Sequence, residues 1–109
     1  MRLRERDKRT IIVRRPDEDA LNEDAYAWGD TMTIRAAIYP AVRELDAQVY
    51  GERISDMRVM LYDGPEALEI GMGVCVNDAD GMPDYRIIRT EQWAHVRATL
   101  ERIPEGRRQ

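Results

Sequence analysis

Residues 36–53 read AAIYPAVRELDAQVYGER, and the change of pattern within this stretch decides the fold. Residues 31–39 lead into it with an alternation of apolar and polar side chains, which is typical of a half-buried strand. The sequence therefore predicts a strand whose buried face carries Met32, Ile34, Ala36 and Ile38.

Pro40 ends this strand, because proline cannot donate a ladder hydrogen bond, and it suits the first turn of a helix. Val42, Leu45 and Val49 then recur at helical spacing, and Gly51 is a natural C-terminal cap. A helix of about three turns is too short to be stable alone, so it must dock on a sheet. We therefore expect an inserted helix near residues 41–50.

Other segments of the chain also have the pattern of strands, and turn signals separate them. The turns are residues 63–65 and 77–84, which are rich in Asp, Gly and Pro. The longest expected strand has the apolar row Leu68, Ile70, Met72, Val74 and Val76, with small residues on its other face. The expected strands are residues 10–14, 57–62, 68–76 and 85–89.

The last segment, residues 91–103, fits two structures. Trp93, Val96, Leu100 and Ile103 have helical spacing, whereas Val96, Ala98 and Leu100 also fit a strand. Local preference leans slightly to a helix. Pro104 stops either structure, and residues 104–109 are expected to form a flexible tail.

Short strands with frequent turn signals favour a mainly β fold. The expected architecture is a small antiparallel β-barrel of about five to seven strands with one inserted helix. A chain of 109 residues with 43% hydrophobic and 35% charged residues fits one domain with one modest core. No apolar run reaches the length of a membrane span, so no membrane is expected. The single cysteine, Cys75, excludes an internal disulfide and fits a reducing cytosol.

The net charge of −4 conceals an asymmetry between two neighbouring segments. Residues 1–15 hold seven Lys or Arg, and residues 16–30 hold six Asp or Glu and no base. We expect a basic arm at residues 1–9 and a long exposed acidic loop at residues 16–30, with Trp28 packing back on the core. Nearly every base is arginine, whose fork pairs with carboxylates, so this pattern fits subunit contacts better than nonspecific DNA coating.

Catalytic and cofactor sites have little support in the sequence. Cys75 and His95 are the only candidates for a nucleophile and its base, and a lone cysteine in an apolar strand is usually a small buried hydrophobe. Four zinc ligands of the Cys/His type are not present. The acidic run at residues 78–84 departs from the calcium-loop spacing, which leaves a solvated turn. We therefore expect no enzyme activity, no metal and no cofactor.

The order of several short motifs resembles a phage or prophage family of head–tail connector (head closure, stopper or head–tail joining) proteins. No single motif is specific, and the likeness rests on their order and spacing over residues 2–103. The motifs are the basic segment with the first strand, Trp28-Gly29, AAIYP at 36–40, VYGER at 49–53, MLYDG at 60–64, GVCV at 73–76, PDYRII at 83–88, Trp93 and LERI at 100–103.

This resemblance implies a β-barrel in which residues 94–103 form the closing strand, and we follow it over the local helix preference because closure removes exposed strand edges. It also implies a structural virion protein that forms a ring at the head–tail interface, closes the DNA-filled head and provides the surface on which the tail docks. The implied partners are portal or adaptor proteins, tail proteins and further copies of the chain. DNA would pass through the channel without sequence-specific binding. The implied location is the host cytoplasm during assembly and then the virion.

Three groups of residues are the candidate subunit or partner contacts. A ring needs head-to-tail contacts between two different patches, and the basic arm and the acidic loop are such a pair. The exposed face of the inserted helix is the third group. The competing interpretation is a small β-barrel binding module, for nucleic acid or protein, without a structural role. The candidates are Arg2, Arg4, Arg6, Asp17, Glu18, Asp19, Arg43, Glu44, Asp46, Gln48 and Arg53.

Overall fold

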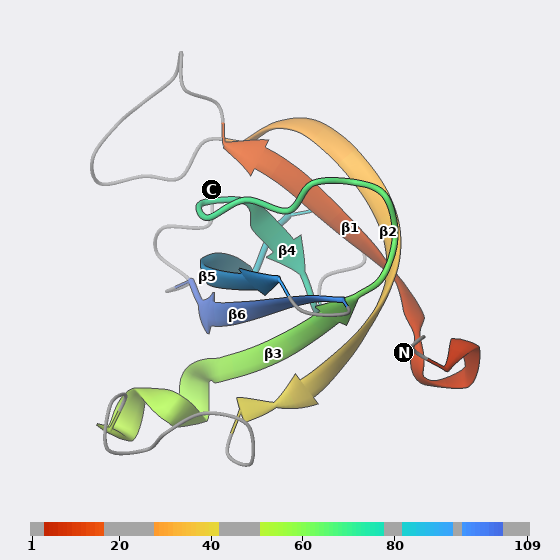
Figure 1. The fold of residues 1–109 in the computed structure, drawn as a ribbon. Coiled ribbons are helices and arrows are strands. Elements are labelled where there is room, and N and C mark those ends of the chain that lie inside the picture. The colour runs from red at the N-terminus through yellow and green to blue at the C-terminus, as the bar shows by residue number, and fades with distance from the viewer. Residues whose placement is uncertain (1–3, 17–27, 42–50, 78–81, 93–94, 104–109) are drawn as a thin grey trace.

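The computed structural model describes residues 4–16, 28–41, 51–77, 82–92 and 95–103. Six strands and two 3-10 turns account for the regular structure of this part of the chain (Figure 1). The elements are η1 (Glu5–Asp7), β1 (Arg9–Pro16), β2 (Trp28–Pro40), η4 (Gly51–Asp56), β3 (Met57–Tyr62), β4 (Gly73–Cys75), β5 (Tyr85–Gln92) and β6 (Val96–Arg102).

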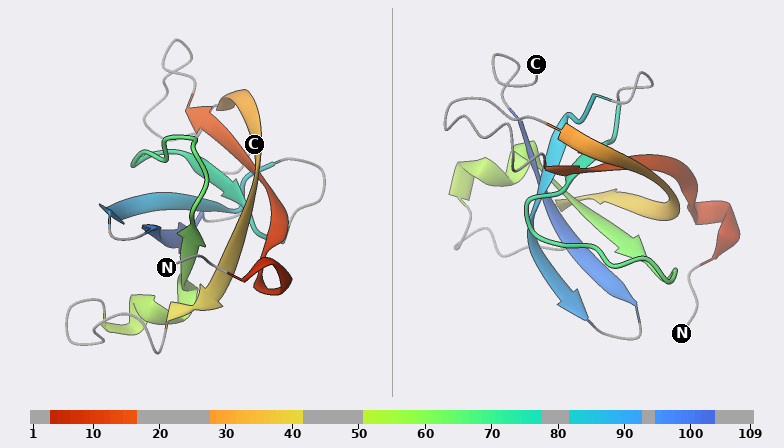
Figure 2. Two further views of the ribbon diagram at one scale, coloured as in Figure 1. Left: turned by 45° about the vertical axis from the view of Figure 1, so that its right-hand side comes forward. Right: turned by 90° about the horizontal axis from the view of Figure 1, so that it is seen from above.

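The six strands form a closed antiparallel barrel in the order β1-β2-β3-β6-β5-β4, which returns to β1. The mainly β prediction and the small barrel are thereby confirmed. β1 and β2 make the longest ribbon, which curves along one side of the barrel with η1 at one end (Figures 1 and 2). β4 is the shortest strand, with three paired positions against β1 and two against β5.

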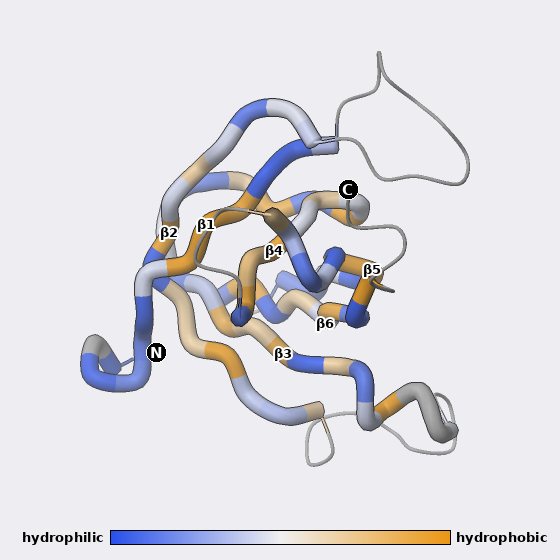
Figure 3. The backbone as a smooth tube through the Cα atoms, turned by 180° about the vertical axis from the view of Figure 1, so that it is seen from behind, coloured by the Kyte–Doolittle hydropathy of each residue, from blue (hydrophilic) through white to orange (hydrophobic). Residues whose placement is uncertain are grey.

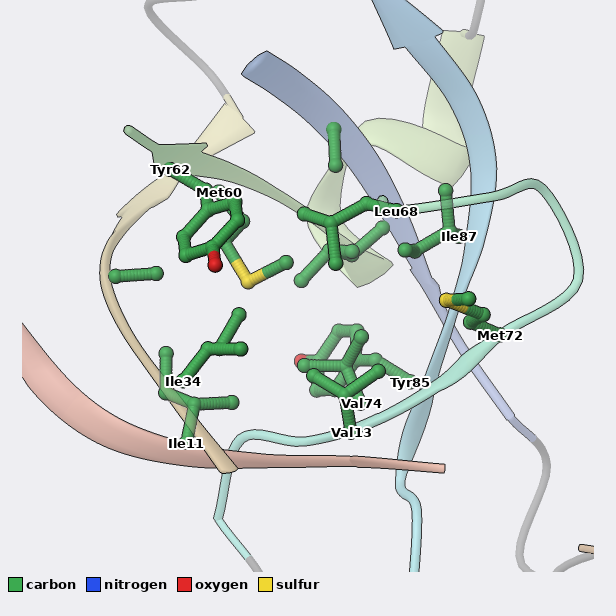
Figure 4. Close-up of a cluster of buried hydrophobic side chains, with 13 residues drawn as sticks. Ile11, Val13, Ile34, Met60, Tyr62, Leu68, Met72, Val74, Tyr85 and Ile87 are labelled. Carbon is green, nitrogen blue, oxygen red and sulfur yellow. The ribbon is translucent and has the colours of Figure 1, made fainter. Parts of the chain in front are cut away.

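One hydrophobic core fills the barrel interior. Inward-facing side chains converge from all six strands, and Leu68 and Met72 add to them from the segment between β3 and β4 (Figure 4). On β2 the predicted buried face is correct, because Ile34 and Ala36 are buried while Met32 and Ile38 pack against the core. This inward face follows from the alternation of side chains along a strand.

A second, smaller cluster lies on the outer face of the barrel. Met57 and Val59 of β3 are buried there with Ala41, and Ile54 of η4 packs against them. β3 is therefore buried on both faces, and its near-continuous apolar sequence is what such a strand requires.

The closing strand is β6, so the local preference for a helix over residues 91–103 is wrong. Val96, Ala98 and Leu100 point inward at a period of two, and β6 pairs with both β3 and β5. Pairing of both strand edges outweighs the helix-forming residues of this segment, a tertiary effect that local sequence does not carry.

The long strand expected over residues 68–76 is also wrong, because only Gly73–Cys75 is strand. The amide of Met72 donates to the carbonyl of Glu69 at 3.2 Å, which closes a turn with Ile70 and Gly71 in its centre. Gly71 has φ +98, a left-handed value that breaks an extended run and favours glycine. Ile70, expected on the buried face, is therefore 64% exposed.

Other expectations differ in extent from the structure. β2 begins at Trp28 and β1 includes Pro16, so both ends of the predicted 16–30 loop belong to strands, and residues 17–27 lie outside the described residues. The predicted helix near residues 41–50 also lies outside them, except Ala41. Gly51, the expected cap, has a left-handed φ of 59 and begins η4. The predicted tail at 104–109 lies outside the described residues as well.

Candidate interaction surface

The two candidate catalytic residues lie at opposite ends of β5. Cys75 follows Val74, which pairs with Tyr85 at the start of β5, whereas His95 precedes Val96, which pairs with Gln92 at its end. At about 3.3 Å per residue, this strand separates the two side chains by roughly 20 Å, far beyond hydrogen-bond reach. Cys75 is buried and does not form a nucleophile–base pair with His95.

Asp84, which lies at the end of the suspected calcium loop, holds strands together. Its carboxylate accepts hydrogen bonds from the amides of Val76 at 2.7 Å and Asn77 at 2.9 Å. Its backbone carbonyl accepts from the amide of Ile103 at 2.8 Å. Asp84 is therefore a buried junction between the ends of β4 and β6 and the start of β5. Among the residues that the structure describes, no three His, Cys, Asp or Glu side chains are grouped to hold a metal ion.

The basic N-terminal segment begins with an exposed part. Arg4 and Arg6 are exposed, and the amide of Asp7 donates to the carbonyl of Arg4 at 3.0 Å, which fixes the short turn η1. Figure 3 shows this segment as a hydrophilic stretch that leaves the barrel beside the start of β1. These two arginines are thus presented to solvent from a defined turn.

Lys8, by contrast, is an anchor within the fold. Its Nζ lies 2.9 Å from Oδ1 of Asp63, and the two side chains are only 7% and 14% exposed. Asp63 follows β3, so this ion pair joins the segment before β1 to the end of a strand 55 positions later. A shielded pair of this kind fixes geometry, because either charge alone would carry a large desolvation cost.

Two further arginines hold their guanidinium groups against backbone carbonyls near this anchor. Arg9 donates to the carbonyl of Val76 at 2.7 Å. Arg35 of β2 donates to the carbonyl of Lys8 and to the hydroxyl of Thr10, both at 3.4 Å. Near the start of β1, the Arg9 guanidinium thus reaches the residue after β4, and the Arg35 guanidinium reaches across from β2.

The other end of the β1–β2 ribbon is held by Arg14. Its guanidinium donates to the carbonyl of Gly29 at 3.1 and 3.3 Å, which ties the end of β1 to the start of β2. Residues 17–27, with most of the acidic residues of segment 16–30, connect the strands at this end. Along the chain, the basic segment therefore precedes β1 and the acidic connection follows it.

A polar cavity of about 350 Å³ lies at one mouth of the barrel, between the segment after β3 and the β5–β6 hairpin. Beside it the Tyr62 hydroxyl makes a short hydrogen bond with the Glu66 carboxylate and accepts from the Glu66 amide. Burial, reinforced by Glu66, raises the pKa of Tyr62 above its usual range. The cavity is lined by Gly64, Pro65, Glu66, Ala67, Leu68, Thr90, Glu91, Gln92 and Val96.

The structure places three of the candidate contact residues. Arg4 and Arg6 are exposed beside β1, and Arg53 belongs to η4. The sequence reasoning placed Arg9 in the basic arm but not among the candidate contacts, and it missed Arg35 and the anchor between Lys8 and Asp63. A signal for the anchor was present, since Lys8 is the single lysine in a chain of arginines. The remaining candidates, Arg2, Asp17, Glu18, Asp19, Arg43, Glu44, Asp46 and Gln48, lie outside the described residues.

Within the described ranges, none of the helical segments is both long and apolar enough to cross a bilayer. Comparison of the chain with protein-family models, with curated proteins and with solved structures found no match.

Proposed function

We propose that this chain is a structural subunit at the head–tail interface of a tailed phage or prophage. Copies assemble into a ring under the portal, close the DNA-filled head and present the surface on which the tail docks. The subunits assemble in the host cytoplasm and remain in the virion. The proposal draws on the order of motifs that resembles the head–tail connector family and on the order of charge along the chain before and after β1.

The observation that carries the proposal is the order of charge along the chain on the two sides of β1. Arg4 and Arg6 precede β1, and the acidic connection follows it after Pro16. Closed rings form from heterologous contacts, in which one patch of a subunit meets a different patch of the next. A basic segment before β1 and an acidic segment after it supply two such patches of opposite charge. The role is contact between proteins, with no chemical step.

Mass measurement in solution tests this proposal directly. The purified chain is measured alone and with a purified portal–adaptor complex by light scattering. We expect a ring of several copies on the complex, and we expect Arg4→Glu with Arg6→Glu to weaken it. Arg102→Glu, which changes an exposed arginine on β6, is the matched control. The connector proposal fails if the chain does not bind the complex, or if assembly is insensitive both to the double reversal and to salt.

A further inference from the structure

The exposed arginines around the start of β1 form a surface that the sequence alone did not delimit. It consists of Arg4, Arg6, Arg9 and Arg35, and we call it the basic rim. All four residues are exposed, and three belong to six consecutive positions of the chain. Arg35 joins them through its hydrogen bond to the carbonyl of Lys8.

The rim is preorganised by uncharged acceptors. Arg9 is held by the carbonyl of Val76, and Arg35 by a carbonyl and a hydroxyl. These bonds help to fix the direction of each guanidinium, and the bond to Val76 does so for Arg9 without cancelling its charge. A preorganised side chain loses less conformational entropy when a ligand binds, so it contributes more to affinity than a free one.

The Lys8–Asp63 pair sets the position of the rim and removes one base from it. Because Lys8 is shielded against Asp63, its charge does not face a partner, and the chain before it leaves the barrel from a fixed point. Within the described part of the chain, no ion pair involves Arg4, Arg6 or Arg9. These three charges therefore face solvent, with Asp7 as an exposed carboxylate between Arg6 and the anchor.

We propose that the basic rim binds a carboxylate-rich segment of a protein partner. Each guanidinium presents a fork that fits a carboxylate with two parallel hydrogen bonds. The acidic segment is the partner of one contact surface of the proposed connector. The inference rests on the connector proposal only in the identity of the protein that supplies this segment.

The charge of the whole chain favours a peptide over duplex DNA as the partner. Four arginines are fewer than the roughly six to ten phosphate contacts that make duplex binding strong. A duplex longer than the rim would also lie against a chain of net charge −4, with exposed carboxylates such as Glu69 on the barrel. A short acidic segment would contact only the basic rim and would avoid the carboxylates elsewhere on the chain.

Fluorescence anisotropy with two probes tests the inference. The probes are a labelled polyglutamate peptide and a labelled short DNA duplex, each titrated with the chain at low and at moderate salt. We expect the peptide to bind more tightly than the duplex, with affinity that falls as salt rises. Arg4→Gln with Arg6→Gln, and separately Arg9→Gln, should each weaken peptide binding about 3- to 10-fold, because each change removes charge-assisted hydrogen bonds to the peptide carboxylates.

Arg102→Gln is the control, and circular dichroism melts establish that each variant is folded. Unchanged peptide affinity in the folded Arg4, Arg6 and Arg9 variants overturns the inference, as does the absence of peptide binding. Tighter binding to the duplex also overturns it and assigns the rim to nucleic acid. Because the probes bind a single dilute chain, the outcome is independent of ring formation. Peptide binding without a ring on the portal complex would remove the connector proposal and leave the rim in place.

Discussion

At the scale of single residues, the ion pair between Lys8 and Asp63 links two parts of the chain that no strand pairing joins. Its Nζ–Oδ1 distance is 2.9 Å and both side chains are largely shielded from water. Arg35 also holds the chain at Lys8, because its guanidinium donates a hydrogen bond to the Lys8 carbonyl. The Lys8–Asp63 pair and the bond from Arg35 therefore both help to fix the site where the N-terminal segment leaves the barrel.

Replacement of Lys8 by methionine should destabilise the fold, because the lysine charge beside the shielded Asp63 carboxylate is removed. We expect the free energy of unfolding to fall by about 3 kcal/mol, measured by urea denaturation. The double change Lys8→Met with Asp63→Leu should recover much of this stability, since no shielded carboxylate then remains. The explanation is wrong if the double variant is as unstable as the two single effects added together.

Tyr62 makes stability depend on pH at the alkaline end. Its pKa is raised in the folded state by burial and by the hydrogen bond to Glu66, so above about pH 10 the folded chain holds more protons than the unfolded chain. This contribution is complete below pH 10 and disappears as pH rises through the folded pKa.

Urea midpoints measured from neutral pH to strongly alkaline pH should fall more steeply for the wild type than for Tyr62→Phe. Tyr39→Phe controls for the removal of a hydroxyl from an exposed ring. Parallel pH profiles for the wild type and Tyr62→Phe would contradict the role given to burial.

At the scale of elements, β4 fits its place because Gly73 has no side chain. A Cβ there would lie 2.6 Å from Cγ of Pro83 and 2.7 Å from Cη2 of Trp28. The groups that approach Gly73 are therefore these two rings. Trp28 thereby packs back on the barrel as expected, and it connects the start of β2 with β4.

Gly73→Ala should cost about 1–3 kcal/mol of stability, because the added methyl group overpacks the space between Trp28 and Pro83. Urea unfolding measures this cost, and Trp28→Leu provides the partner variant for a double-mutant cycle. Gly73→Ala should cost less in the Trp28→Leu background, where one of the two neighbouring rings is removed. An equal cost in both backgrounds would exclude Trp28 as a source of the clash.

The sequence predicted well those strands in which apolar and polar side chains alternate and no helical spacing or turn-forming glycine competes with this pattern. β2 and β3 follow directly from alternation and composition, and Pro40 ends β2 as expected. The error at residues 68–76 arose because alternation cannot show that Gly71 takes a positive φ and turns Ile70 outward. Local sequence favoured a helix over residues 91–103, whereas β6 forms within this segment because it pairs with β3 and β5.

The interaction surface was predictable in part, for a similar reason. Clustered charge in the sequence identified Arg4 and Arg6, since charge is visible along the chain. Arg35 joins the rim only through the register that pairs it with Thr10, and Asp63 meets Lys8 only through barrel closure. Contacts between distant segments depend on topology, which local patterns do not encode.

At the scale of the whole molecule, β4 is the strand of the barrel with the fewest paired positions. β4 pairs at three positions with β1 and at two with β5, whereas β1 and β2 share seven paired positions. Fewer paired positions give a lower free energy of local opening, so β4 should open before the rest of the barrel unfolds.

Cys75 reports this opening, because the residue is only 6% exposed and pairs with Ile12 where β4 meets β1. We expect the free energy of opening from thiol labelling to be at least about 1 kcal/mol below the global value. Labelling with an aromatic disulfide reagent gives the first quantity, and circular dichroism during urea unfolding gives the second. Equal values would mean that the barrel opens only as a whole.

The closure of the barrel by β4 has a consequence for the order of events during synthesis. β1 and β2 can pair as soon as both have left the ribosome, but the second edge of β1 stays open until residues 73–75 emerge. Lys8 likewise waits 55 positions for Asp63. The strand made first thus has one unpaired edge while β2 and β3 are made, and until β4 emerges this free edge is open to wrong partners. A nascent chain that stalls before Gly73 would carry this open edge, so rapid completion of translation protects the fold.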